Sequence, residues 1–215
     1  MHGRALCLRH LLVVFGLVLA AGFLARPGYG ADAPMELAGI RLGETLAEAG
    51  KTVAHPETDR SFHKPYLGLA AVAPVPGYRS GYVDYGLCAK PGRIVRLKMN
   101  YADESLEFFE RILEALTKRY GAPQEWRGNA FRTLRTWKWS LRAAGGEPVS
   151  LILMHYEGED GAFTEGNSIR LAATGMVHDE EVCYDAKYKK SDAFEAARAE
   201  AAKNKKLGLD WFLPR

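Results

Sequence analysis

Few side chains in this chain have the type and spacing that chemistry requires. The chain has six histidines, and the four beyond residue 30 are His55, His63, His155 and His178. No two of these four are three or four residues apart, the spacing that puts two metal ligands on one helix face. The sequence also lacks a nucleophile elbow (Gly-x-Ser-x-Gly) and a phosphate-binding loop (Gly-x-x-x-x-Gly-Lys-Ser/Thr). It therefore predicts no catalytic residue, no metal site and no cofactor, and favours a protein that is not an enzyme.

The competing interpretation is a hydrolase or a metal-dependent enzyme whose site is assembled from distant segments. Its candidate residues are His155, His178, Glu157 and Asp179. Imidazole and carboxylate groups can serve as general acids, general bases or metal ligands. Substituting these four residues would abolish an enzyme and leave an interaction module unaffected.

Basic residues on three predicted strands form the group of side chains that could most readily bind a ligand. In segments 93–101, 131–142 and 168–176 they alternate with apolar residues, so each set lies on one side of its strand. If the strands are neighbours, these residues form a basic plate on the solvent side of the sheet, made of Arg96, Lys98, Lys138, Arg142 and Arg170. Two interpretations stay open. The plate binds an anionic partner, such as an acidic protein surface, a lipid headgroup or a cell-wall polymer, or it is a solvated face neutralised by acidic neighbours.

The cysteines indicate a structural disulfide. Of the three, Cys7 lies in a segment that we expect to be removed, which leaves Cys88 and Cys183. Two cysteines in an oxidising compartment most often pair. A bridge that closes a loop of about 95 residues could stabilise the fold by up to ~4–5 kcal/mol. A shared metal or two free thiols is the alternative.

The start of the chain predicts a secretory signal peptide over residues 1–30. Basic residues precede an apolar run from Leu11 to Ala25, and small residues follow it. The run is shorter than the roughly twenty residues of a membrane span. We therefore expect cleavage after Gly30, with Ala33 as the alternative, and no transmembrane segment in the mature chain. The mature chain (31–215) is predicted to be one domain that is periplasmic or secreted.

Net charge argues against nucleic acid as a partner. Residues 1–30 hold three basic residues and no acidic ones, so their removal leaves 26 of the 29 Lys and Arg, against 26 Asp and Glu. Proteins that bind nucleic acid usually carry a strong basic excess. A neutral mature chain lacks that excess.

Hydrophobic periodicity predicts the elements that position these residues. Helices are expected over 44–54, 105–120 and 191–205, and strands over 78–88, 93–101, 131–142, 149–156 and 168–176. The proline-rich stretch that ends at Gly77 is expected to be extended or looping chain. The second helix has Asp103 as its predicted cap and an apolar stripe of Leu106, Phe109, Ile112, Leu113, Leu116 and Tyr120.

Two further features have alternative interpretations. Trp137 and Trp139 share the apolar face of one predicted strand, which indicates core beneath a helix, with stacking on a sugar as the alternative. Lysines at the end of the last helix interact favourably with the negative end of the helix dipole. Followed by the apolar tail Leu207–Leu213, they could instead contact a membrane surface.

The predicted fold class is α+β: a two-layer sandwich of a mostly antiparallel sheet with helices packed on one face. An apolar-x-Leu-Gly turn feeds the first helix (Ile40–Gly43), and Arg119–Pro123 closes the long one before a strand with two tryptophans. With these motifs, residues 38–175 resemble small secreted envelope domains of the BamE-like and β-lactamase-inhibitor-like groups, and uncharacterised periplasmic proteins. The chain differs from the BamE pattern in lacking a lipobox and in being longer. The resemblance implies a binding or assembly module, whose partner we expect to be an envelope protein or an anionic envelope component.

Overall fold

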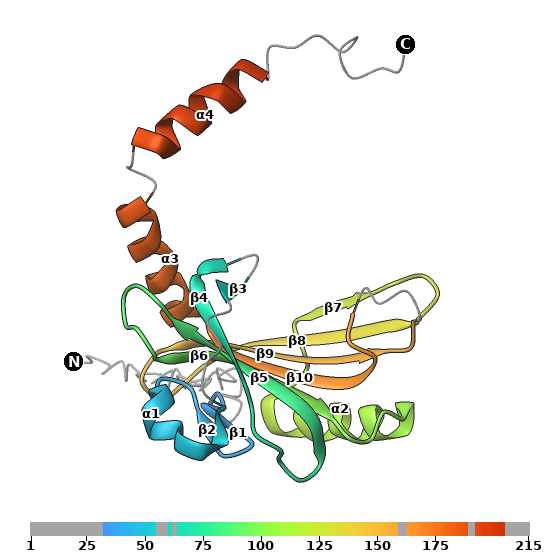
Figure 1. Cartoon of the computed structure of the whole chain (residues 1–215). Coiled ribbons are helices and arrows are strands. Elements are labelled where there is room, and N and C mark those ends of the chain that lie inside the picture. The colour runs from blue at the N-terminus through green and yellow to red at the C-terminus, as the bar shows by residue number, and fades with distance from the viewer. Residues whose placement is uncertain (1–31, 55–59, 62–63, 159–162, 189–191, 205–215) are drawn as a thin grey trace, which may run out of the picture.

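The computed structural model describes residues 32–54, 60–61, 64–158, 163–188 and 192–204 (Figure 1). The predicted signal peptide and apolar tail lie outside these ranges, as do His55 and His63. In chain order the elements are β1 (Glu36–Leu37), β2 (Ile40–Arg41), α1 (Leu46–Ala49), the 3-10 turn η1 (Gly50–Thr52), β3 (Arg60–Ser61), β4 (Lys64–Ala71), β5 (Tyr78–Gly86), β6 (Ile94–Tyr101), α2 (Leu106–Tyr120), β7 (Glu125–Gly128), β8 (Leu134–Arg142), β9 (Pro148–Tyr156), β10 (Gly166–Ala173), α3 (Thr174–Tyr188) and α4 (Asp192–Asn204).

An eight-stranded antiparallel sheet is the centre of the molecule. Its strand order is β3-β4-β5-β6-β10-β9-β8-β7, and β1 and β2 form a separate two-stranded ladder. Two runs of sequential strands, β3 to β6 and β7 to β10, meet where β6 pairs with β10. The α+β class with a mostly antiparallel sheet therefore agrees with the prediction. The strands that carry the predicted basic plate lie in adjacent or near-adjacent positions.

Helix α2 covers one face of the sheet with its apolar stripe (Figure 1). Phe109 and Tyr120 are buried, and the other stripe residues are half-buried against the same core. The helix begins one residue later than predicted because Ser105, not Asp103, is its cap. The Ser105 Oγ accepts a hydrogen bond from the Phe108 N–H at 3.2 Å. Asp103 accepts hydrogen bonds from the N–H and hydroxyl of Ser105 and so holds the cap residue in place.

Trp139 of β8 lies in the core beneath α2. It is fully buried, and its indole N–H donates to the Gly121 carbonyl at 2.8 Å, which joins β8 to the end of α2. The core prediction is confirmed for this residue. Trp137 is half-buried in the same cluster, and its ring lies 6.3 Å from that of Trp126 on β7.

The prediction of a strand over 168–176 is wrong in its last part. The strand ends at Ala173, and the next residue begins α3, a helix that was not predicted. Helix α3 stands at one end of the sheet, on the side away from α2 (Figure 1). There Val177 and Tyr184 pack against Tyr66 and Val95. The prediction that the helices share one face is therefore not confirmed.

Two links hold α3 to the loop between β5 and β6. The Cys88 and Cys183 sulfurs are bonded at 2.08 Å, in agreement with the predicted disulfide. The Glu180 carboxylate, only 1% exposed, accepts backbone N–H bonds from Cys88, Ala89 and Lys90 at 2.7, 2.9 and 2.7 Å. A disulfide fits an oxidising compartment.

Other differences from the predicted elements are local. The proline-rich stretch contains the eight-residue strand β4, and the first helix is a single turn, α1, with a capping box formed by Thr45 and Glu48. The last helix, α4, agrees with its predicted range within a residue and lies away from the sheet (Figure 1). None of the described helices is long and apolar enough to cross a membrane.

Candidate functional site

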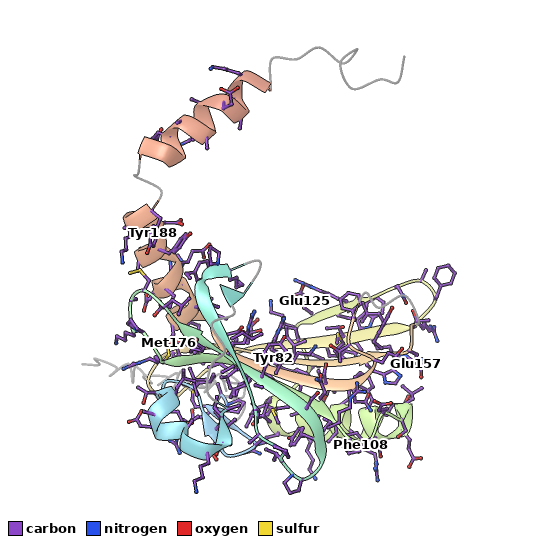
Figure 2. All side chains as sticks on the ribbon, in the orientation of Figure 1. Tyr82, Phe108, Glu125, Glu157, Met176 and Tyr188 are labelled. Atoms are coloured by element: carbon purple, nitrogen blue, oxygen red, sulfur yellow. A yellow bond between two sulfur atoms is a disulfide. The ribbon has the colours of Figure 1, made fainter. Side chains whose placement is uncertain are left out.

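The face of the sheet opposite α2, called here the open face, carries one continuous cross-strand row. Successive strand partners place six residues side by side across β5, β6, β10, β9, β8 and β7: Tyr82, Lys98, Arg170, Ile152, Lys138 and Glu125. Figure 2 labels the two ends of this row, Tyr82 and Glu125, and also Phe108 of α2 on the other side of the sheet. Directly paired residues point to the same face, so the row is a single surface.

A pocket of about 300 Å³ lies over this row. Its lining comes from six adjacent strands and from the loop between β9 and β10, with Arg127 on β7 and Tyr82 on β5 at opposite sides. Six strands span roughly 24 Å at the usual spacing. Residues so far apart line one pocket, so this side of the sheet is hollowed. Phe163 from the loop completes the lining.

The cations on the open face fall into two groups. Arg96 forms an ion pair with the buried Asp84, and Glu125 pairs with both Arg127 and Lys138. Lys98 and Arg170 are different, since no carboxylate within the described ranges forms an ion pair with either. The Lys98 ammonium donates to the Thr164 hydroxyl at 2.8 Å and lies 5.9 Å from the centre of the Tyr82 ring.

Lys98 and Arg170 are also direct cross-strand partners. Like charges in that position destabilise a sheet. Burial lowers the pKa of Lys98, and the positive charges of Arg170 and Arg79 lower it further. Burial likewise lowers the pKa of Arg170, with Arg96 as the next cause. The charge of Asp84, which is paired with Arg96, offsets only part of this effect on Arg170. Two neighbouring cations are thus partly withdrawn from water with no ion-pair partner in the described chain, an arrangement that a bound anion would stabilise.

The floor between the cations is apolar. Ile152 and Met154 of β9 and Leu134 of β8 line the pocket, although they lie on the face opposite α2. The opposite face of β9 presents Leu151 and Leu153 to the core. A strand of an antiparallel sheet with one solvated face normally alternates apolar and polar residues. β9 departs from that pattern over the pocket, because Ile152 and Met154 are apolar residues on the solvated face.

By their register all five predicted plate residues lie on the open face, and three of them, Lys98, Lys138 and Arg170, line the pocket. Arg96 lies one step along the same face, paired with Asp84. Arg142 lies exposed at the end of β8, on the same face. Its guanidinium donates to the Gly146 carbonyl of the hairpin turn at 3.1 Å. All five predicted residues therefore share the open face, but Arg96 and Arg142 lie outside the pocket.

The histidine and carboxylate candidates are not brought together as a group of four. His155 and Glu157 are neighbours, and the His155 Nε2 lies 2.8 Å from the Glu157 Oε1, within ion-pair distance. The two groups are not aligned for a hydrogen bond. His178 and Asp179 are exposed on α3, which follows the opposite end of the β9–β10 ladder. His155 lies six positions along β9 from Val149, which is at that end, or about 20 Å of strand.

His155 has a structural partner of its own. The fully buried imidazole lies with Nδ1 at 2.7 Å from the Asn167 Oδ1. The amide nitrogen of Asn167 donates to the carbonyls of Asp103 and Ser105, so its oxygen must accept and the Nδ1 must carry the hydrogen. This chain of contacts holds the start of α2 to β9 and β10. Among the described residues, no cluster of three or more His, Cys, Asp or Glu side chains could hold a metal.

The fold and the pocket together define an α+β protein with a concave, cation-lined sheet face. A comparison of the chain with protein families, with curated proteins and with solved structures finds no match. The resemblance to small envelope domains therefore stays an expectation.

The sequence held one signal for the pocket that periodicity alone did not use. The run from Leu151 to Met154 is apolar on both faces of its strand, in a sheet with helices mainly on one side. Tyr82, Arg127 and Phe163 had no such signal, because they reach the pocket only through strand order and the course of a loop.

Proposed function

We propose that this protein is an exported, non-catalytic binding module that holds an anionic ligand on the open face of its sheet. The observation that carries the proposal is the pair Lys98 and Arg170. These two cations are adjacent, partly withdrawn from water and without an ion-pair partner in the described chain, and they line a pocket. An anion between them would offset both the desolvation and the repulsion.

A binding role is favoured over catalysis by the state of the histidine candidates. Both ring nitrogens of His155 face groups of the protein itself, and the ring packs 5.4 Å from Phe109 in the core. A general base must reach the proton that it abstracts. A fully buried imidazole whose Nδ1 is already bonded to Asn167 is poorly placed for that task.

Export is part of the proposal, and it rests on the predicted signal peptide and on the disulfide. We expect cells that express the full chain to release a protein that begins at Ala31. Intact-mass measurement and N-terminal sequencing of the recovered protein test this. A protein that retains residues 1–30, or that remains cytoplasmic with reduced cysteines, would contradict export.

Anion binding is tested by NMR on the protein recovered after export, with methyl-labelled Ile and Met. We expect inorganic phosphate, or short polyglutamate, to shift the Ile152 and Met154 methyl signals. Lys98→Met and Arg170→Met should each weaken this binding by about 10- to 100-fold, the effect of losing one hydrogen bond to a charged group.

Arg142→Met is the matched control. It removes the same charge from the same face, but outside the pocket. Binding that falls equally in all three variants would indicate attraction by overall charge and would contradict a site at Lys98 and Arg170. Arg96→Glu and Lys138→Glu are less informative, because each breaks an ion pair of the folded protein.

A further inference from the structure

The pocket on the open face combines two features that point to one class of ligand. One side offers charge, through Lys98 and Arg170. Beside them lies apolar surface, from Leu134, Ile152 and Met154 on the sheet and from Phe163 of the loop. Lys138 and Arg127 border this surface on its far side, and both are paired with Glu125. Neither feature alone is unusual on a protein surface, but a small ligand in this pocket would contact both.

The charged part of the pocket suits a compact anion. Lys98 and Arg170 are opposite each other on β6 and β10, so their side chains leave the sheet about 5 Å apart. The guanidinium offers a planar fork of donors for carboxylate or phosphate oxygens, and the ammonium offers a mobile point charge. Ser168, on the same face of β10, adds a hydroxyl to the lining.

The apolar part suits a short chain or ring joined to that anion. Ile152 lies directly between Arg170 and Lys138 in the cross-strand row, and Met154 is next to it on the same face of β9. Methionine adapts its shape to different apolar partners. Phe163, 46% exposed, contacts the Tyr156 ring edge-on at the mouth of the pocket.

We propose that the ligand of this pocket is a small anionic amphiphile, with a phosphate or carboxylate group held by Lys98 and Arg170 and a short apolar chain or ring on Ile152, Met154 and Leu134. This inference rests on the proposed function, since it names the ligand class for the same site.

The size and shape of the site favour a small molecule over a macromolecule. A volume of about 300 Å³ lies at the small end of ligand pockets, which typically measure about 300–1,000 Å³. A partner with a flat acidic surface would contact the exposed Arg142 and the paired Arg96 as readily as the recessed cations. A polymer without apolar groups would leave the Ile152–Met154 floor in contact with water.

Calorimetry on the exported protein with a series of alkyl phosphates, from methyl to hexyl phosphate, tests the ligand class. Each added methylene should tighten binding by up to about fourfold while it enters the pocket, and the gain should stop once the pocket is full. Hexanol, which has the chain without the anion, should bind at least 100-fold more weakly than hexyl phosphate. Met154→Ser should reduce the gain per methylene without changing the affinity for methyl phosphate.

Lys98→Met and Arg170→Met should weaken every member of the series by about 10- to 100-fold, and Arg142→Met should change none of them by more than twofold. Vesicles of phosphatidylglycerol, compared with vesicles of phosphatidylcholine, separate a free amphiphile from a lipid headgroup in a bilayer. Binding to the anionic vesicles alone, with no binding of hexyl phosphate, would overturn the inference.

The failures of the two proposals are distinguishable. Equal affinity for methyl and hexyl phosphate, lost in Lys98→Met, would overturn the amphiphile and leave the anion site standing. If no phosphate or polyglutamate binds while the unfolding transition shows a folded protein, the proposed function fails together with the inference.

Discussion

At the scale of single residues, Lys98 has the environment of a ligand-binding side chain and not of a stabilising one. Its ammonium is partly buried, opposite Arg170, and has no ion-pair partner in the described chain. We expect Lys98→Met to keep the free energy of unfolding within about 0.5 kcal/mol at pH 7, or to raise it, while anion binding weakens by about 10- to 100-fold. Urea denaturation of both proteins measures this. A clear loss of stability would assign Lys98 a structural role.

The pH dependence of Lys98 has a definite sign. Burial holds its pKa in the folded protein below the ordinary lysine value. Between these two pKa values the unfolded chain binds more protons, so stability rises with pH across that window. Anion binding needs the charged form and should fall as pH rises through the lowered pKa. The Lys98→Met variant should lack both changes, which denaturation and calorimetry between pH 7 and 11 would show.

His155 is the residue whose substitution best separates structure from catalysis. We expect His155→Leu to lower the free energy of unfolding by about 2–3 kcal/mol, because the Asn167 Oδ1 would be buried without a donor. His178→Leu, at an exposed position of α3, should change it by less than about 0.5 kcal/mol. A His155 variant that is fully stable yet inactive in an assay of the protein would favour the enzyme interpretation.

At the scale of elements, Glu180 anchors α3 to the loop before β6. A glutamine at this position has one acceptor oxygen and would turn its NH₂ group toward at least one of the three N–H donors. We expect Glu180→Gln to lower the free energy of unfolding by about 2–4 kcal/mol. Glu181→Gln, exposed on the same helix, is the control and should be neutral.

Glycine at position 86 belongs to the same anchor. A Cβ there would lie 2.2 Å from the Glu180 Oε1, so alanine would displace the carboxylate.

The Glu180 carboxylate also accepts hydrogen bonds from the Cys88, Ala89 and Lys90 amides. We expect hydrogen exchange of these three amides to be faster in Glu180→Gln than in the unchanged protein. Unchanged protection of these amides would show that the carboxylate is not their partner in solution.

At the scale of the whole molecule, the disulfide joins α3 to the sheet across 95 residues of sequence. Reduction, or the double change Cys88→Ser and Cys183→Ser, should lower stability by about 4–5 kcal/mol in the chain-entropy treatment. Melting curves with and without reductant measure this, and a thiol count on the native protein should find neither sulfur free. A melting temperature that reductant does not change would contradict a structural bridge.

The sequence alone determined the features that depend on local order. Periodicity gave the long helix α2 and the core strands β5, β6, β8 and β9 to within a few residues, because burial of one face requires a repeat of 3.6 or 2. The terminal helix α4 followed from its Ala-, Glu- and Lys-rich composition. Periodicity also placed the five basic residues on the polar faces of their strands: Arg96, Lys98, Lys138, Arg142 and Arg170. The cysteine pair followed from there being only two beyond the predicted signal peptide.

Only the tertiary structure decided which of these faces meet. Strand order set Lys98 against Arg170, paired Arg96 with Asp84 and left Arg142 at the rim, and none of these relations is contained in the spacing along one strand. Helix α3 was missed because its anchors, Glu180 and Cys183, act on backbone and sulfur more than 90 residues away. The pocket likewise takes its lining from six strands and one loop, so it is a property of the assembled sheet and of no single segment.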